Sequence, residues 1–216
     1  MHKFLILAVL VLTGCVVFPE GRESAARILV IGDSIMAWNR GDGAAIPDVI
    51  ERRLGQPVLD ASVPGARMRL GGLRGAVGLS IPRQYREGDW DTVILNGGAN
   101  DLRATCGCNR CDAVLDRLAR QDYPALIARL APARVVIVGY YGPVRGGGGS
   151  FDGCSDELSE LGRRLARLAA ANPRVTFVPV RAAIAGDPRY YDTDRVHPSP
   201  EGSALIGALV ARAVSG

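Results

Sequence analysis

Short runs of aliphatic residues recur along the chain, and longer segments with a different spacing separate them. The runs are RILVIG (27–32), PVLDAS (57–62), DTVILN (91–96), RVVIVG (134–139) and VTFVPV (175–180). Continuous apolar runs of this length are typical of strands that are buried on both faces. The pattern therefore predicts five buried β-strands.

Between the runs, apolar residues recur at intervals of three and four, which places them on one face of a helix. They form four groups: Ile46, Val49, Ile50 and Leu54; Val114, Leu115 and Leu118, continued beyond Pro124 by Leu126, Ile127 and Leu130; Leu158, Leu161, Leu165 and Leu168; Leu205, Ile206, Leu209 and Val210. Ser199 and Pro200 suit the cap and first turn of the last helix. The alternation of strand and helix predicts an α/β fold with a parallel sheet covered on both faces.

The first residues differ from the rest of the chain. A basic start and an apolar run from Phe4 to Leu12 are typical of an export signal too short to span a bilayer. Leu12-Thr13-Gly14-Cys15 resembles the lipobox of bacterial lipoproteins, which implies cleavage before Cys15 and a lipid on that residue. We therefore expect a signal peptide over 1–14, lipidated Cys15 with a tether over 15–26, and one domain over 27–216. A secretory signal cut near Gly21 is the alternative.

This N-terminus predicts an exported protein of the bacterial cell envelope that is anchored by lipid and faces the periplasm. The formal net charge is +4, and the basic residues are scattered rather than gathered in one block. A nucleic-acid binder would carry a concentrated basic patch. We therefore expect the membrane, through the anchor, as a partner and no nucleic acid.

Four cysteines follow Cys15, and their even number in an exported chain favours disulfide bonds. They are Cys106, Cys108, Cys111 and Cys154. Two bridges are expected, and the sequence leaves all three pairings open. The alternative is a metal site in CGCNRC, but no second nearby pair of thiols and no histidines at zinc-finger spacing accompany it. We expect no metal.

Residues that can take part in catalysis follow the predicted strands at their carboxyl ends, where open α/β sheets bind ligands. Ser34 follows the first run and Asp194 and His197 follow the fifth. A serine hydroxyl needs a base before it can attack a carbonyl, and beyond the signal segment His197 is the sole imidazole. Asp194, three residues earlier, can hold one ring nitrogen and leave the other free to face Ser34.

Acyl transfer also needs donors aimed at the developing oxyanion, each contributing roughly 3 kcal/mol. The Ser34 amide lies where a helix is expected to start, and helix N-termini leave N–H groups unpaired. Gly65, after the second run, allows a close backbone approach because it lacks a Cβ. Asn100, after the third run, supplies a side-chain amide. Together these residues predict an ester-cleaving site.

Four segments resemble the ordered blocks of the SGNH, or GDSL-type, hydrolase superfamily: GDSI (32–35), Gly65 in VPGARM, GAND (98–101) and DRVH (194–197). The resemblance implies a three-layer α/β/α sandwich around a flavodoxin-like, five-stranded parallel sheet. It also implies that Ser34 is the nucleophile of a triad with Asp194 and His197. Ser34, Gly65 and Asn100 would then form the oxyanion hole. Ile35 stands where the motif's name has Leu.

The expected function is a serine esterase that hydrolyses O-acyl esters, O-acetyl among them, of cell-envelope saccharides, because an anchored enzyme meets such polymers. The alternatives are a lipase, lysophospholipase or thioesterase acting on acyl chains. A further alternative is a non-catalytic, glycan-binding envelope lipoprotein. The mark of such a binding protein would be a broken triad, and here every position is filled.

Other features leave alternatives open. The sequence has no phosphate-binding loop or dinucleotide pattern, so no cofactor is expected. The glycine run at 146–149 is interpreted as a flexible surface loop or, alternatively, as a mobile lid held at one end by a disulfide through Cys154. Trp38, Tyr140 and Tyr141 can either line a pocket or take part in ordinary packing.

Overall fold

The computed structural model describes residues 25–70, 72–74 and 78–216. The predicted signal peptide, Cys15 and nearly all of the predicted tether therefore lie outside the described residues.

One parallel sheet forms the centre of the described chain, with the strand order β2-β1-β3-β4-β5. The five strands are β1 (Ile28–Ile31), β2 (Val58–Asp60), β3 (Thr92–Leu95), β4 (Arg134–Val138) and β5 (Val175–Val178). All five predicted strands are present, but β2 and β5, which lie at the two edges of the sheet, are only partly buried. β1 and β3 are buried along their whole length because helices cover both faces, which explains why their apolar runs are unbroken.

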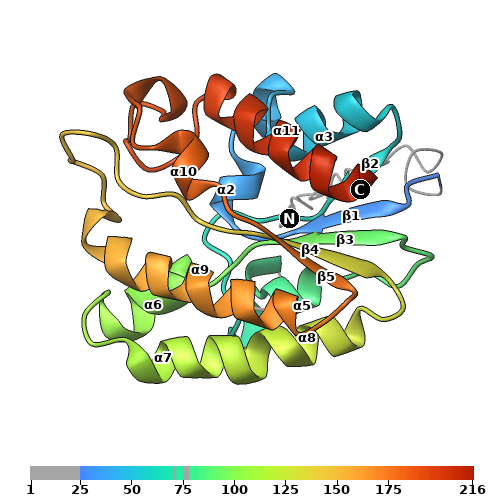
Figure 1. Cartoon of the computed structure of the whole chain (residues 1–216), viewed down its shortest axis with the longest axis horizontal. Helices are drawn as coiled ribbons and strands as arrows, with labels where there is room; N and C mark the ends of the chain where they lie inside the picture. Colours follow the sequence, from blue (N-terminus) through green and yellow to red (C-terminus); the bar gives the residue numbers. More distant parts are fainter. Residues whose placement is uncertain (1–24, 71, 75–77) are drawn as a thin grey trace, which may run out of the picture.

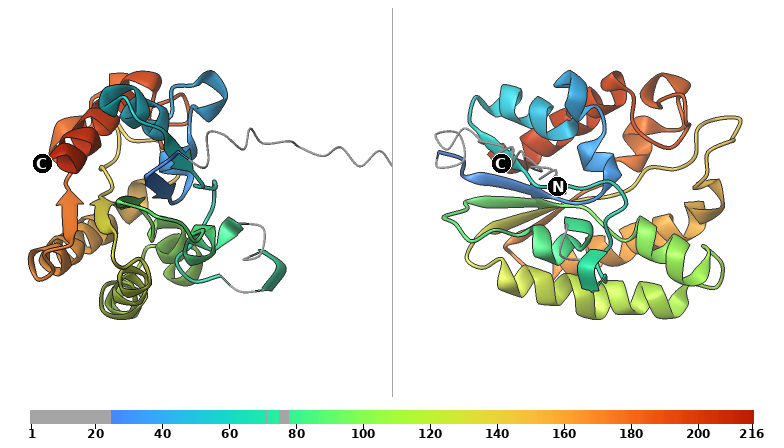
Figure 2. Two further views of the ribbon diagram at one scale, coloured as in Figure 1. Left: turned by 90° about the vertical axis from the view of Figure 1, so that its right-hand side faces the viewer. Right: turned by 180° about the vertical axis from the view of Figure 1, so that it is seen from behind.

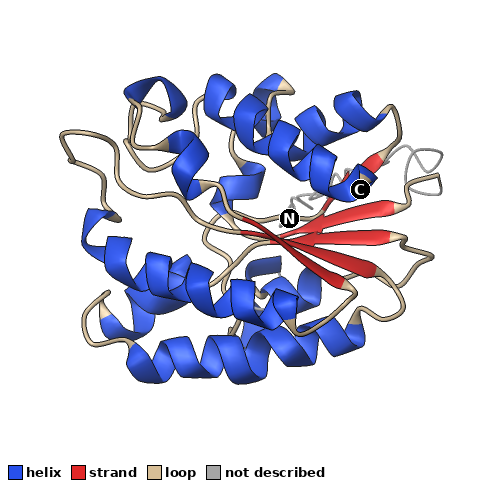
Figure 3. Ribbon diagram, in the orientation of Figure 1, coloured by secondary structure: helices blue, strands red, loops and turns tan. Residues whose placement is uncertain are grey.

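Helices cover both faces of this sheet and produce the predicted three-layer sandwich (Figures 1 and 3). One face carries α2 (Ser34–Ala37), α3 (Ile46–Leu54), α10 (Arg181–Ile184) and α11 (Pro200–Ser215). The other carries α5 (Ile81–Gln84), α6 (Ala99–Cys106), α7 (Asp112–Arg117), α8 (Tyr123–Arg129) and α9 (Ser155–Ala170). The short turns are η1 (Arg40–Asp42), α4 (Gly72–Arg74), η3 (Leu118–Asp122), η4 (Asp152–Cys154) and η5 (Pro188–Tyr190).

The last helix begins as its sequence predicts. The Ser199 hydroxyl accepts a hydrogen bond from the Gly202 amide, and Pro200 occupies the first helical position. α11 then packs against α3 at Gly207, where a Cβ atom would lie 2.6 Å from Val49. This glycine allows the two helices to approach closely.

The helical stretch around Pro124 is continuous rather than broken. α7, η3 and α8 follow one another without a loop, and η3 is a turn of π-helix immediately before α8. Proline cannot donate a backbone hydrogen bond inside a helix, and a wider turn can absorb that missing bond. The apolar spacing on both sides of Pro124 therefore belongs to one long helical segment.

Two disulfide bonds settle the pairing that the sequence left open. Cys106 pairs with Cys111, which closes a short loop after α6. Cys108 pairs with Cys154, which ties this loop to η4 at the start of α9. In the described ranges, no three His, Cys, Asp or Glu side chains cluster where they could hold a metal ion.

The loops at the carboxyl ends of the strands gather at one edge of the sheet, on the left in Figure 1. The same edge is seen from behind in the right-hand panel of Figure 2. No helix within the described ranges combines the length and hydropathy needed to span a membrane.

Candidate active site

Ser34 is the first residue of α2, one turn of helix that begins directly after β1. Asp33 caps this helix, because its Oδ1 accepts a hydrogen bond from the Ile35 amide at 3.0 Å. Gly32 makes the close passage between strand and helix possible, since a Cβ there would lie 2.4 Å from Asn96 Oδ1. The hydroxyl of Ser34 is thereby held at the edge of the sheet where ligands bind.

The loop between η5 and α11 carries Asp194 and His197. Asp194 Oδ1 accepts the backbone N–H groups of Val196 and His197, each at 3.0 Å, which folds the loop into a tight turn. His197 Nδ1 lies 2.5 Å from Asp194 Oδ2, and its Nε2 lies 2.8 Å from Ser34 Oγ. The fold therefore brings together three side chains whose positions in the sequence span most of the chain.

The charge of Asp194 decides the proton positions in this arrangement. Burial raises the pKa of the carboxyl group, but hydrogen bonds from the His197 amide, the His197 ring and the Val196 amide outweigh burial and hold the pKa below its ordinary value. An ionised carboxylate only accepts hydrogen bonds, so His197 Nδ1 donates to it. His197 Nε2 is then free to accept the proton of Ser34 Oγ.

Asn100 lies in the first turn of α6 rather than in a loop, and it lines the same pocket as Ser34. Its Nδ2 donates to the Ala66 carbonyl at 3.1 Å, which ties α6 to the turn containing Gly65. Gly65 has a φ of +78°, a backbone conformation that favours glycine. Within the described residues, the backbone amides of Ser34 and Gly65 donate to no other group. These donors therefore remain available to an incoming oxyanion.

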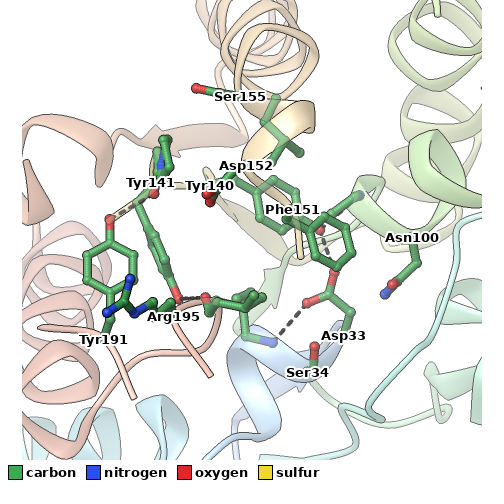
Figure 4. Close-up of a pocket in the computed structure, with 16 residues that line it drawn as sticks. Asp33, Ser34, Asn100, Tyr140, Tyr141, Phe151, Asp152, Ser155, Tyr191 and Arg195 are labelled. Atoms are coloured by element: carbon green, nitrogen blue, oxygen red, sulfur yellow. Dashed lines mark hydrogen bonds between the residues drawn. The ribbon is translucent and has the colours of Figure 1, made fainter. Parts of the chain in front are cut away.

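A pocket of about 50 Å³ opens beside Ser34. Figure 4 shows Ser34 and Asn100 on one side of it and Tyr141 and Tyr191 on the other. Most of its lining is aromatic or aliphatic: Ile35, Ala99, Tyr140, Tyr141, Pro143, Phe151, Leu158, Tyr191 and Val196. The pocket therefore suits an apolar group attached at the Ser34 side.

A model of the GDSL-like lipase/acylhydrolase family matches residues 30–205. The chain belongs to this family. The match covers all four motif blocks and most of the described residues, so the resemblance to SGNH, or GDSL-type, hydrolases is confirmed. The protein is accordingly a hydrolase that acts on ester bonds.

Solved structures of other hydrolases share the fold of this GDSL-like protein. A lipase/acylhydrolase from Enterococcus faecalis is 22% identical with a TM-score of 0.65, covering 88% of this chain and 95% of its own. A carbohydrate acetylesterase family member from Sinorhizobium meliloti is 16% identical with a TM-score of 0.64, covering 87% and 96%. A candidate SGNH hydrolase from Slackia heliotrinireducens is 24% identical with a TM-score of 0.56, covering 88% and 99%. No curated protein matches the chain.

Trp38 makes a contact in this hydrolase that the sequence did not indicate. Its indole stacks on the imidazole of His197. Its Nε1–H donates to Asp192 Oδ2 at 2.6 Å. The second of the two expectations for this residue, packing, is closer to what the structure shows, but the packing partner is a residue of the candidate site.

A buried pair joins the helices that carry Ser34 and Asn100. The Tyr140 hydroxyl donates to Asp33 Oδ2 at 2.5 Å and accepts from the Ala99 amide at 3.3 Å. Burial raises the pKa of Asp33, partly offset by the hydrogen bond from Tyr140, and burial together with the charge of Asp33 raises the pKa of Tyr140. Tyr140 therefore keeps its proton and fixes the start of α2 relative to the start of α6.

Two further side chains of this hydrolase hold the strand ends in place. Asp101 is buried and accepts the amides of Met68 and Arg69 at 2.8 and 3.1 Å, which fixes the segment after Gly65. Burial raises the pKa of Asp101 to about 6 against the effect of these hydrogen bonds. Gln84 accepts from the Gly32 amide at 2.7 Å and donates to the Gly32 carbonyl at 3.0 Å.

The glycine run at 146–149 lies against the loop that carries Asp194 and His197. Arg195 Nη1 donates to the Gly147 carbonyl at 2.6 Å. The amides of Gly148 and Gly149 donate to Asp152 Oδ2 at 2.7 and 3.1 Å. The described conformation is therefore held by specific hydrogen bonds, and the interpretation of this run as a lid remains a prediction.

Proposed function

We propose that the protein is a serine esterase that removes O-acyl groups, acetyl groups in particular, from saccharides of the cell envelope. The observation that carries the proposal is the hydrogen-bonded series from Ser34 Oγ through His197 to Asp194. This series lies beside a small apolar pocket. It has the geometry that a serine nucleophile with an oriented base requires.

In the proposed reaction, His197 Nε2 removes the proton from Ser34 Oγ as that oxygen attacks the ester carbonyl carbon. The carbonyl oxygen becomes an oxyanion that accepts hydrogen bonds from the Ser34 and Gly65 amides and from Asn100 Nδ2. The protonated His197 then gives its proton to the departing alcohol, which leaves the acyl group on Ser34. Asp194 stabilises the positive charge of the imidazole ring between these steps.

The second half of the reaction restores the enzyme. A water molecule gives a proton to His197 Nε2 and attacks the acyl carbonyl carbon, forming a second oxyanion at the same donors. The intermediate collapses, the Ser34 oxygen recovers its proton from His197, and the carboxylic acid leaves. Protons and electron pairs therefore balance over the two steps with water as the sole co-reactant.

Two observations support a short acyl group on a saccharide rather than a long-chain lipid. The pocket beside Ser34 is small, at about 50 Å³, and a small pocket favours a short acyl group. The structural neighbour from Sinorhizobium meliloti is described as a carbohydrate acetylesterase family member. An anchored enzyme of the envelope would also have acetylated polymers within reach.

The test compares the wild type with Ser34→Ala, using the exposed Ser150→Ala as the control. A fluorophosphonate probe is expected to label the wild type and Ser150→Ala and to leave Ser34→Ala unlabelled. Acetate release from O-acetylated glycans is expected to follow the same order. Labelling or acetate release that survives in Ser34→Ala would overturn the nucleophile, and a wild type that releases acetate from no glycan would overturn the saccharide.

We also propose that Cys15 carries a lipid that holds the enzyme at the envelope membrane, facing the periplasm. The support is the sequence Leu12-Thr13-Gly14-Cys15 after an apolar run. Cys15→Ser is expected to move the protein from the membrane fraction to the soluble fraction. Cys106→Ser, which leaves the lipobox intact, is the control for loss of a cysteine elsewhere, and membrane association that is unchanged in Cys15→Ser would contradict the anchor.

A further inference from the structure

A second hollow, of about 210 Å³, lies between α9 and β5 at the side of the sheet. Its lining consists of Gly139, Tyr140, Leu158, Ser159, Gly162, Arg163, Ala166, Phe177, Pro179, Val180 and Arg181. We call this hollow the α9–β5 groove. Its centre is formed by apolar atoms, and it is several times larger than the pocket beside Ser34.

The pocket beside Ser34 and the α9–β5 groove share two lining residues, Tyr140 and Leu158. Tyr140 is fixed, because its hydroxyl bonds to both Asp33 and the Ala99 amide. Leu158 is held by apolar packing alone and is 6% exposed. Tyr140 and Leu158 together separate the pocket from the groove. Of these two side chains, Leu158 is the one that can be replaced without breaking a hydrogen bond.

Two glycines that contact Phe177 line the groove, Gly139 and Gly162. A Cβ at Gly139 would lie 2.8 Å from Phe177 Cζ, so packing requires glycine at that position. A Cβ at Gly162 would lie 3.7 Å from the same atom, which is an ordinary contact, so alanine would fit there. Gly162 lies in the middle of α9 and lines the groove, so a larger side chain placed there would occupy part of the groove.

The size of the pocket limits what can be attached to Ser34. A cavity needs roughly 10–15 Å³ to hold one water molecule. A pocket of about 50 Å³ is small on this scale and matches a short acyl group. A longer chain would meet Leu158, and the space beyond Leu158 is the apolar groove.

We propose that Leu158 determines the acyl-chain length of this esterase by separating the pocket at Ser34 from the α9–β5 groove. The wild type accordingly takes esters of short acyl groups, and truncation of Leu158 joins the two hollows into one site for a medium acyl chain. This proposal rests on the proposed esterase function. An apolar chain is the matching occupant, because the residues that separate the two spaces present only a ring and an aliphatic side chain to them.

The test measures kcat/KM of the full chain for nitrophenyl acetate, butyrate and decanoate. In Leu158→Ala the decanoate-to-acetate ratio is expected to rise at least 10-fold, because the additional CH₂ groups of decanoate would be buried in the groove. Leu161→Ala is the matched control: Leu161 is a buried leucine one turn along the same helix and lines neither hollow. The ratio in this control is expected to match the wild type.

A second pair of variants works in the opposite direction. Leu158→Ala/Gly162→Leu places a side chain in the groove and is expected to return the ratio to within about 3-fold of the wild type. Leu158→Phe places a larger side chain against the pocket at Ser34 and is expected to lower the butyrate-to-acetate ratio. This variant tests the proposal even where Leu158→Ala is too unstable to assay.

The outcomes separate this proposal from the function on which it rests. The role of Leu158 would be overturned if the wild type is active and Leu158→Ala has the same decanoate-to-acetate ratio. It would also be overturned if the double variant keeps the raised ratio. Both results would leave the esterase function intact. A change of the same size in Leu161→Ala would also overturn the role of Leu158. A wild type that hydrolyses no ester and resists the fluorophosphonate probe would instead overturn the proposed function.

Discussion

The imidazole of His197 lies flat against the indole of Trp38, with ring centroids 3.7 Å apart and planes 6° from parallel. The indole is itself fixed, because its Nε1–H donates to Asp192. Asp192 in turn donates its backbone amide to the His197 carbonyl at 2.8 Å. The His197 ring is therefore positioned by the Trp38 indole on its face as well as by Asp194 at Nδ1.

Removing this stack should slow the chemical step. Aromatic pairs contribute about 0.5–1.5 kcal/mol beyond simple burial, so Trp38→Leu is expected to lower kcat about 2- to 10-fold with little change in KM. Trp38→Phe keeps a ring and should recover most of the loss. Trp90→Leu is the control for loss of a tryptophan outside the site. Steady-state kinetics on nitrophenyl acetate decides the matter, and an unchanged kcat in Trp38→Leu would show that the stack is incidental.

Asp101 should make the stability depend on pH in a specific direction. Its folded-state pKa is about 6, whereas an unfolded aspartate titrates near 4. Between these values the folded state binds more protons, so the free energy of unfolding falls as the pH rises, by about 3 kcal/mol in total. Asp101→Asn is expected to flatten this slope in urea unfolding between pH 4 and 7. The exposed Asp116→Asn should keep it, and an equal slope in wild type and Asp101→Asn would contradict the assignment.

Loss of the Tyr140 hydroxyl should cost more stability than loss of another buried tyrosine hydroxyl. Tyr140→Phe removes the donor to the buried Asp33 carboxyl group and the acceptor of the Ala99 amide, and a buried polar group left unsatisfied costs about 1–3 kcal/mol. Tyr123 donates to the neutral Gly97 carbonyl, so Tyr123→Phe is expected to cost about 1 kcal/mol. Chemical denaturation of the two variants gives the comparison. A larger loss in Tyr123→Phe would contradict the greater structural role of the Tyr140 hydroxyl.

The two disulfides should contribute unequally. Cys108 and Cys154 are separated by 46 positions, and Cys106 and Cys111 by 5. The chain-entropy relation then gives about 4 kcal/mol for the longer loop and about 2 kcal/mol for the shorter. Replacing each pair by serine and measuring urea unfolding checks the order. A reversed order would mean that effects in the folded state dominate over loop entropy.

The sheet was predictable because its signal is local. A strand buried on both faces must be apolar throughout, so the runs of the inner strands, such as Ile28–Ile31, stand out in the sequence, and the edge strands β2 and β5 carry shorter apolar runs. α5 was not predicted, since its four residues carry no full helical repeat. α6 was also missed, and Asn100 was placed in a loop, because the helix is short and starts after a glycine with positive φ.

Other features of the site depend on contacts between distant residues, and such contacts leave no local pattern. Gln84 and Tyr140 look like ordinary polar residues in the sequence, yet each bonds to the segment just before Ser34. The disulfide pairing depends likewise on how α6 and η4 meet in space. The sequence did predict that Ser34, Asp194 and His197 lie together. Each follows the carboxyl end of a predicted strand, and a parallel sheet places these ends at a common edge.

The disulfide bond between Cys108 and Cys154 links two helices as well as two loops. It joins the segment that follows α6, the helix of Asn100, to the start of α9, the helix of Leu158. Both helices contribute to the pocket at Ser34. A buffer that contains a thiol reductant would break the covalent link between the two sides of the pocket. Enzyme prepared with a reductant and enzyme prepared without one would therefore differ in covalent structure. Their substrate preferences can be compared only when the redox history of each sample is known.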